Sequence, residues 1–239
     1  MFSSLACLAA AENNQEDTGP PAEEIAVEQP QAPGNDGQIT VYDPLEPVNR
    51  VFFTFNDKLH FWLLKPTTKV YLKIVPATAR QGIKNFFQNI TTPVRTANAL
   101  LQGELDSAIT TGARFSVNST AGVLGLMDPA AEKLELPLQK RDFGQTLGKY
   151  HIPYGIYLTW PILGPASIRS SAGKVGDYFL NPVSYMDGDI RSVSNPVQRI
   201  NDLSFELDKY DKLRKAPDPY TRLRDSFLKN REKLIEKTD

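Results

Sequence analysis

Apolar residues recur every three or four positions along most of this chain, and that spacing limits what it can fold into more than any other feature. The clearest stretch follows Asp43-Pro44, which supplies an N-cap and a first-turn proline. Its apolar face comprises Val48, Val51, Phe52, Phe55, Leu59, Trp62 and Leu63. Further stretches with helical spacing lie at 66–75, 83–90, 94–101, 105–116, 165–179, 197–213 and 219–234. Strand-like alternation is nearly absent, so we predict an all-α fold.

Short polar residues followed by proline mark where several of these helices should begin. The pairs start at Asp43, Asp128, Asn181, Asn195 and Asp218. Asp and Asn cap helix N-termini, and proline is tolerated in the first turn because its missing N–H would have no partner there. We expect a helix to start at each of the five.

The first helix is apolar on two sides. Phe53, Phe61 and Leu64 fall opposite its main apolar stripe when residues are placed at about 100° intervals. A helix of this kind is either wholly buried in its own domain or faces another apolar medium, for which lipid is one candidate. The sequence of this helix alone leaves both interpretations open.

Residues 122–164 break the helical pattern without becoming polar. Glycine or proline recurs throughout this stretch, yet 123–127 and 152–163 are among the most apolar segments of the chain. Long loops of this kind are uncommon in compact domains and are often functional. Non-helical backbone at membrane depth is tolerated where protein buries it or where it lines a cavity.

The net charge of −1 for 239 residues conceals two opposite imbalances. The first 38 residues contain seven acidic residues and no basic one, which leaves 27 basic and 21 acidic residues in the remainder. The balance argues against a dedicated nucleic-acid binder, which is normally strongly basic. Residues 8–38 are rich in Pro, Glu and Gln, so we predict a disordered acidic tether that spans roughly 30 Å.

The one cysteine of the chain, Cys7, excludes an intramolecular disulfide and a multi-cysteine zinc site. Ser4-Leu-Ala-Cys7 resembles the end of a bacterial lipobox, in which the cysteine carries the lipid. A basic region and a full apolar region should precede it, and a start codon placed too far downstream would explain their absence. The alternative is an accidental cysteine in a flexible tail. We therefore divide the chain into a signal-peptide remnant with the lipobox cysteine at 1–7, the tether at 8–38 and an all-α domain at 39–239.

The sequence offers no recognisable catalytic or cofactor motif. It contains no nucleophile elbow, phosphate-binding loop, zinc-protease signature or dinucleotide fingerprint. Its two histidines, His60 and His151, stand apart and have no metal-ligand spacing. It also lacks an apolar run of about 18 residues, so no transmembrane helix is predicted. We expect no catalytic site, no metal and no cofactor.

An ordered series of short motifs resembles the VacJ/MlaA lipoproteins of Gram-negative outer membranes. The motifs are Tyr42-Asp-Pro-Leu-Glu-Pro-Val-Asn-Arg50, Phe55-Asn56, Lys65-Pro66, Asn85-Phe-Phe-Gln-Asn89, Asn98-Ala-Leu-Leu-Gln-Gly103, Arg114-Phe-Ser-Val-Asn118, Gly122-Val-Leu-Gly-Leu-Met-Asp128, Asp142-Phe-Gly-Gln-Thr-Leu-Gly148, Pro161-Ile-Leu-Gly-Pro165, Ser167-Ile-Arg169 and Asp218-Pro-Tyr220. They extend over about 40 to 225 in family order. The chain departs from the family in its truncated signal peptide and imperfect lipobox.

The resemblance implies a ring-like, single helical domain embedded in one membrane leaflet, with a central amphipathic channel. It implies an outer-membrane lipoprotein on the periplasmic face, anchored through Cys7, that removes phospholipids mislocalised to the outer leaflet. A periplasmic carrier protein would receive them for return to the inner membrane, and a trimeric porin of the outer membrane would be the other partner. The resemblance also implies that the helix around Val48 and Asn49 controls opening.

A phospholipid that leaves a bilayer needs an apolar wall for its chains and a polar wall for its headgroup. We place the lipid channel or gate in the broken apolar stretch, with the candidates Leu124, Leu126, Met127, Tyr157, Trp160, Ile162 and Leu163. One alternative is an outer-membrane structural or porin-accessory lipoprotein without transport activity. Another is a soluble lipid carrier with an enclosed cavity and no anchor. A hydrolase is the weakest alternative, because the required nucleophile and base spacing is missing.

Overall fold

The computed structural model describes residues 43–236, so Cys7 and the predicted tether lie outside the described residues. The helices are α2 Glu46–Leu59, α3 Lys65–Ile74, α4 Ala77–Ile90, α5 Thr92–Leu101, α6 Leu105–Thr120, α7 Pro129–Glu132, α8 Phe143–Lys149, α9 Ile168–Leu180, α10 Gly188–Leu203, α11 Leu207–Arg214 and α12 Pro219–Glu236. A π-helical turn, η1 His60–Leu64, joins α2 to α3, and a 3₁₀ turn, η2 Pro182–Tyr185, precedes α10. The strands are β1 Tyr157–Trp160 and β2 Gly164–Ser167. The predicted helical fold is confirmed.

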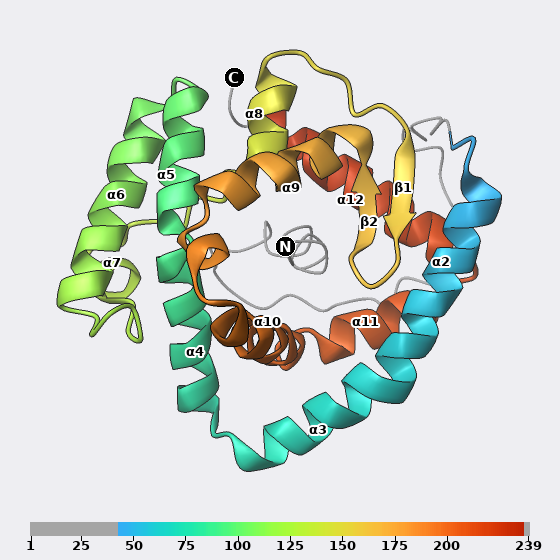
Figure 1. The fold of residues 1–239 in the computed structure, drawn as a ribbon, viewed down its shortest axis with the longest axis horizontal. Coiled ribbons are helices and arrows are strands. Elements are labelled where there is room, and N and C mark those ends of the chain that lie inside the picture. Colours follow the sequence, from blue (N-terminus) through green and yellow to red (C-terminus); the bar gives the residue numbers. More distant parts are fainter. Residues whose placement is uncertain (1–42, 237–239) are drawn as a thin grey trace, which may run out of the picture.

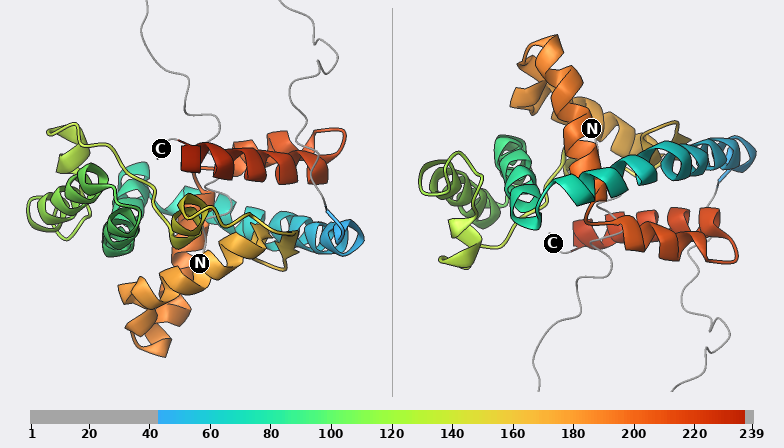
Figure 2. Two further views of the ribbon diagram at one scale, coloured as in Figure 1. Left: turned by 90° about the horizontal axis from the view of Figure 1, so that it is seen from above. Right: turned by 90° about the horizontal axis from the view of Figure 1, so that it is seen from below.

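The elements follow one another around a ring (Figure 1). Its perimeter runs from α2 through η1 and α3 to α4 and α5, and α9 and the strand pair complete it. α6 packs on the outer side of α5, and α10 packs against α3 and α4 from within. Seen from the edge, α12 lies on one face of the ring, and the corner of α9 and α10 protrudes from the other (Figure 2).

α2 and α3 form one continuous helical arm, although the sequence suggested two helices. The join is η1, where the Lys65 N–H donates to the His60 carbonyl five residues earlier. Pro66 follows immediately and cannot donate a backbone hydrogen bond. A π turn widens the helix locally, and it lets the arm pass the proline without ending.

The broken stretch contains a β-hairpin that we did not predict. Tyr157 pairs with Ser167 and Trp160 with Gly164 in an antiparallel ladder. Ile162 and Gly164 adopt positive φ values of 69° and 80° at the turn. Burial alternates along β1, where Tyr157 and Thr159 are buried and Trp160 is exposed. The buried positions are not all apolar, however, and the exposed one is not polar. Hydrophobic alternation therefore could not indicate it.

Asn195-Pro196 does not start a helix, contrary to our expectation. α10 begins at Gly188 and includes Pro196 in its interior. Tertiary packing against α3 and α4 overrides the local penalty of an internal proline. The other four Asx-Pro pairs lie at or just before a helical start, and the side chains of Asp128 and Asn181 accept backbone N–H groups there.

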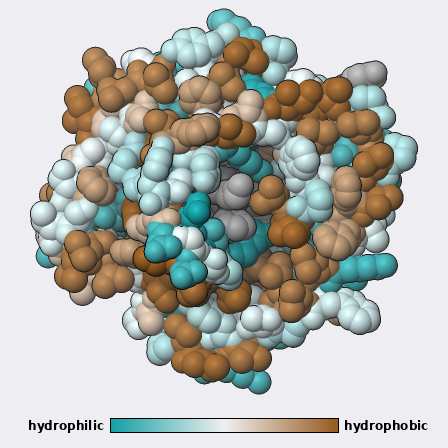
Figure 3. Space-filling view, viewed as in Figure 1, coloured by the Kyte–Doolittle hydropathy of each residue, from teal (hydrophilic) through white to brown (hydrophobic). Residues whose placement is uncertain are grey.

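The distribution of side chains is inverted relative to that of an ordinary soluble domain. The most deeply buried side chains include Asn49, Asn98, Asn201, Thr68 and Thr146. The exposed ones include many large apolar residues, of which Trp62 is 80% and Ile74 73% exposed. Apolar side chains gather around much of the rim in Figure 3. A compact apolar core exists, but it is small, and Tyr157, Tyr220, Phe227 and Leu228 form its centre.

Candidate functional site

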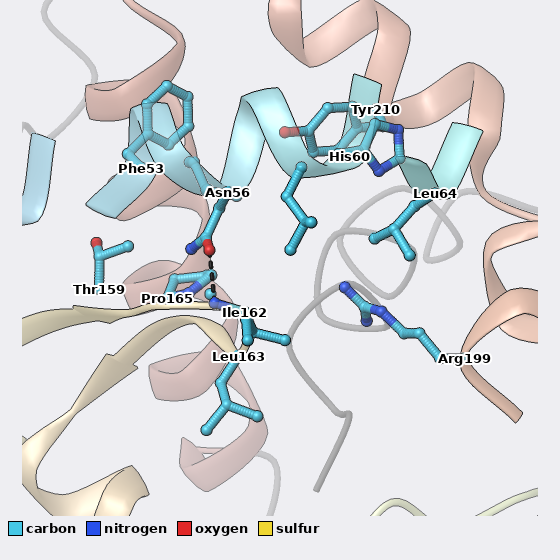
Figure 4. A pocket seen from close by; sticks show the side chains of 13 residues that line it. Phe53, Asn56, His60, Leu64, Thr159, Ile162, Leu163, Pro165, Arg199 and Tyr210 are labelled. Atoms are coloured by element: carbon cyan, nitrogen blue, oxygen red, sulfur yellow. Dashed lines mark hydrogen bonds between the residues drawn. The ribbon is translucent and has the colours of Figure 1, made fainter. Parts of the chain in front are cut away.

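A cleft lies between the first helical arm, the hairpin turn and the C-terminal helices. It holds about 570 Å³ of space, part of which is open to solvent. Its lining residues are Phe53, Asn56, Leu59, His60, Leu64, Thr159, Ile162, Leu163, Gly164, Pro165, Arg199, Tyr210 and Leu223. They come from α2, η1, the hairpin, α10, α11 and α12, so the cleft exists only in the assembled ring (Figure 4).

The cleft combines apolar and polar linings. Ile162 and Leu163 enter from the hairpin turn, below the helical arm in Figure 4, while Arg199 enters from α10. Burial lowers the pKa of the Arg199 guanidinium, and the neighbouring carboxylates Glu206 and Asp202 oppose that effect. An arginine remains charged under these conditions. The cleft therefore presents apolar side chains from the hairpin turn and a charged guanidinium, with carboxylates nearby, from α10.

His60 occupies the π turn and is almost completely buried. Its ring packs on Tyr210 with centroids 3.7 Å apart, and neither ring nitrogen has a hydrogen-bond partner among the described residues. Burial, together with the Arg199 charge, lowers the pKa of His60 to about 4. The imidazole is therefore neutral at pH 7, and the positive charge of the cleft belongs to Arg199.

Two asparagines of α2 hold the hairpin against the helical arm. Asn49 accepts from the Thr159 N–H at 2.8 Å and donates to the Tyr157 carbonyl at 3.1 Å. Asn56, two helical turns later, accepts from the Ile162 N–H at 2.6 Å and donates to the Trp160 carbonyl at 2.9 Å. The hairpin turn is thus attached to α2 by side-chain hydrogen bonds at both its strand and its tip.

The predicted gate residues fall into separate groups. Ile162 and Leu163 line the cleft, and Trp160 lies beside it with its indole N–H donating to Ser171 Oγ at 3.0 Å. Tyr157 belongs instead to the core, where its ring packs edge-on against Tyr220 and Phe227. It is fully buried beneath these rings and is not among the residues that line the cleft, so it cannot contact a ligand in this arrangement.

Leu124, Leu126 and Met127 lie outside the cleft. They belong to the exposed loop between α6 and α7, which contacts α4 through a hydrogen bond from Asn85 to the Leu126 carbonyl. Of the predicted gating pair, Asn49 is buried under the hairpin, and Val48 is half exposed on the same helix. The structure therefore brings Asn49 together with strand β1 of the hairpin but not with the α6–α7 loop.

Of the residues that line the cleft, only Ile162 and Leu163 were predicted from the sequence. Those that were missed include the polar side chains of Asn56, His60, Arg199 and Tyr210. A signal existed for one of them, because Asn56 follows Asn49 by seven residues and so lies on the same face of the first helix. Arg199 and Tyr210 reach the cleft only through the fold.

Residues 43–236 contain no helix that is long and apolar enough to cross a membrane. Nor do they contain a group of three or more His, Cys, Asp or Glu side chains that could hold a metal ion.

The described residues form a helical ring with buried amides and exposed apolar side chains around its rim. Exposed apolar surface of this extent is typical of proteins that contact a membrane or another protein. The chain belongs to the MlaA lipoprotein family, whose model matches residues 41–234. The resemblance of the sequence motifs to this family is thereby confirmed.

Individual relatives agree with this assignment. An uncharacterised protein of Rickettsia felis is 34% identical over 205 residues, which are 84% of this chain and 80% of the relative. The intermembrane phospholipid transport system lipoprotein MlaA of Escherichia coli is 30% identical, over 78% of this chain and 75% of its own. The Haemophilus influenzae protein of that name is 31% identical, over 79% and 77%.

A solved structure has the same fold. Its subject is the structural basis for maintenance of bacterial outer membrane lipid asymmetry. The TM-score is 0.73 at 31% identity, and the match covers 81% of this chain and 99% of the other.

Proposed function

We propose that this protein removes mislocalised phospholipids from the outer leaflet of a Gram-negative outer membrane and passes them to a periplasmic carrier. The proposal rests on the inverted distribution of side chains, with an apolar rim around buried amides and a cleft of mixed polarity. The names of the Escherichia coli and Haemophilus influenzae relatives support it, since both are intermembrane phospholipid transport lipoproteins. This activity would maintain lipid asymmetry.

In this proposal the ring lies in the inner leaflet, on the periplasmic side of the outer membrane. Its exposed apolar residues, Trp62 and Ile74 among them, contact acyl chains and fix its depth. A lipid on Cys7 anchors the chain, and the tether at 8–38 joins the anchor to the ring. Hydrophobic contact of the rim would contribute about 25 cal/mol for each Å² of apolar surface that leaves water.

The cleft is the proposed lipid route. A phosphate of the headgroup would meet Arg199, while the acyl chains would follow Phe53, Leu64 and Leu163. Arginine suits this role because its guanidinium donates two parallel hydrogen bonds to phosphate oxygens and keeps its charge. The route requires no covalent chemistry, and we assign the protein no enzymatic activity.

The hairpin turn is the proposed gate. Ile162 and Leu163 would move to admit a lipid, and the hydrogen bonds of Asn49 and Asn56 would hold the closed position. Val48 and Asn49 would act through the helix that carries this attachment. Leu124, Leu126 and Met127 form a second apolar group on the α6–α7 loop, for which a gating role remains a prediction.

The partners proposed are a trimeric porin and a periplasmic phospholipid carrier protein. The family resemblance supports both. A structural or porin-accessory lipoprotein is the second candidate function, and it would need the apolar rim but not the cleft.

Replacing Ile162 with Glu tests the route. Glutamate would place a charge where acyl chains pass, so phospholipid should accumulate at the cell surface as in cells that lack the protein. Ile162→Leu is the matched control. It places another side chain at the same positive-φ position without adding a charge, so it should transport normally. Leu126→Glu, with Leu126→Met as its control, tests the second group in the same assay.

The measurement is surface-exposed phospholipid in cells that express each variant at equal levels in the outer membrane. Normal asymmetry with folded Ile162→Glu protein would contradict the cleft route and favour the accessory function. If lipid asymmetry is lost in Ile162→Glu cells but normal in Leu126→Glu cells, the α6–α7 loop is not part of the gate.

A further inference from the structure

A second pocket lies between α4, α5, α6 and α7, and it shares no lining residue with the cleft. It holds about 230 Å³ of space, part of which is open solvent. Its lining is Asn85, Gln88, Asn89, Thr92, Arg95, Arg114, Asn118, Asp128 and Leu138. Apart from Leu138 these side chains are polar, so the pocket is suited to a charged or hydrogen-bonding group rather than an acyl chain.

Arg114 is neutralised within the pocket. It forms an ion pair with Asp128 at 2.6 Å and donates to the Leu136 carbonyl. Asn118 donates to the other Asp128 oxygen at 2.8 Å. Hydrogen bonds from Arg114 and Asn118 hold the pKa of Asp128 below its usual value, so the carboxylate remains ionised at pH 7.

Arg95 is not neutralised in this way. It donates to the Gln88 carbonyl and to Thr91 Oγ1, each at 3.1 Å, and both acceptors are uncharged. Burial and the nearby Arg114 charge lower the pKa of Arg95 to about 10, which leaves it charged at pH 7. The charges that line the pocket are therefore two cations and one anion. These two contacts use two of the five donor hydrogens of Arg95.

The pocket borders the most exposed apolar loop of this region. Asn85, in its lining, donates to the Leu126 carbonyl, and Gly125 lies so close to Asn89 that an added Cβ would come within 2.4 Å. In the same loop Leu124 is 70% and Met127 61% exposed. The net positive charge of the pocket therefore lies beside an exposed apolar surface. A phosphate ester with an apolar substituent could contact both.

We propose that this pocket binds a phosphate group, with Arg95 as its principal donor. The phosphate oxygens would accept hydrogen bonds from Arg95 and from the Asn85 and Gln88 amides, which line the same pocket. The group could belong to a phospholipid headgroup whose chains lie on the α6–α7 loop, or to free inorganic phosphate. This site is separate from the cleft and does not depend on the proposed route through it.

Calorimetry on the full chain in a non-ionic detergent tests the proposal. The probes are inorganic phosphate and a short-chain, water-soluble phosphatidylglycerol. We expect at least one probe to bind, and Arg95→Gln to weaken it about 10-fold or more, as for the loss of a charged hydrogen bond. Arg222→Gln removes an exposed arginine on α12 and should leave binding unchanged.

The two probes identify the source of the phosphate. Binding of phosphatidylglycerol alone assigns the pocket to lipid headgroups, and binding of inorganic phosphate alone assigns it to the free anion. Absence of binding by either probe, or equal binding by the native protein and Arg95→Gln, would overturn the proposal. Ile162→Glu should bind the probe normally, so failure of the cleft route and failure of this site give different results.

Gln88→Glu provides a second variant should Arg95→Gln not fold. It keeps the arginine and places a carboxylate in the pocket that would neutralise it. Binding should weaken about as much as in Arg95→Gln. Unchanged binding by a folded Gln88→Glu protein would count against a phosphate site.

Discussion

At the scale of single residues, buried amides and carboxylates organise the ring. Asn98 on α5 donates to Asp177 on α9 at 2.8 Å, and the Phe143 N–H at the start of α8 donates to the same oxygen at 3.0 Å. Arg231 on α12 forms a two-bond ion pair with Asp142, the N-cap of α8. These polar contacts join helices that ordinary soluble domains would join through apolar packing.

Asp177 makes stability depend on pH. Burial, with a smaller contribution from Asp142, raises the pKa of Asp177 to about 6, whereas an unfolded Asp has a pKa of about 3.9. The folded state therefore binds the proton more tightly. The stabilisation that this proton gives is complete below about pH 4 and is lost as the pH rises through about 6.

Asp177→Asn should consequently stabilise the fold at pH 7. Asparagine keeps the accepting oxygen but carries no charge, so we expect a gain of about 1 to 2 kcal/mol, reduced because the side chain is only partly buried. Thermal unfolding in detergent at pH 4 and pH 7 measures it. The variant should exceed the native protein only at the higher pH, and an equal difference at both values would contradict the assignment.

The sequence indicates apolar faces but not where single residues lie. Tyr157 and Ile162 belong to one apolar segment, yet the first lies in the core and the second lines the cleft. Tyr157 lies in strand β1 and Ile162 in the hairpin turn, and hydrophobic alternation does not indicate this strand. Arg199 is far from both in the chain, so its place beside the hairpin depends on the closure of the ring.

At the scale of elements, most helices could be predicted from their spacing, since each buries one face against a neighbour. The exceptions have local physical causes. The hairpin places mixed residue types on each face, and α10 accepts an internal proline because α3 and α4 pack against it. The π turn that joins α2 to α3 depends on Pro66, whose effect could equally be to end a helix.

The hairpin should loosen when its tip is released from α2. Asn56→Ala removes the acceptor of the Ile162 N–H and the donor to the Trp160 carbonyl. Amide hydrogen exchange over 160–164 should accelerate about 10-fold or more, because a hydrogen bond contributes about 1 kcal/mol and these two act together.

Gln81→Ala is the control for this exchange experiment. It also removes a side-chain hydrogen bond from a helix, to Asn85 on α4, but it does not touch the hairpin. Exchange at 160–164 should be unchanged in that variant. Equal exchange in the native protein and Asn56→Ala would mean that the asparagine does not hold the turn.

At the scale of the whole molecule, the apolar rim is the feature that links fold to function. The two apolar sides of the first helix left open whether it is wholly buried or faces another apolar medium. The structure excludes complete burial, because Val51 and Trp62 of the main apolar stripe are exposed. Phe53 and Leu64, on the opposite side, line the cleft. The ring itself could be anticipated only through the family resemblance, since ring closure joins segments that are distant in sequence.

Fluorescence quenching tests the central claim, that the rim lies among acyl chains. The chain has two tryptophans, so Trp160→Phe leaves Trp62 as its single indole. We would incorporate this variant in vesicles of phospholipids brominated on their acyl chains and compare its emission with that in unbrominated vesicles. Trp62→Phe, which retains Trp160 with its indole bonded to Ser171, serves as the matched variant. The account predicts strong quenching of Trp62 and weaker quenching of Trp160, whereas a Trp62 emission unaffected by bromine would contradict it.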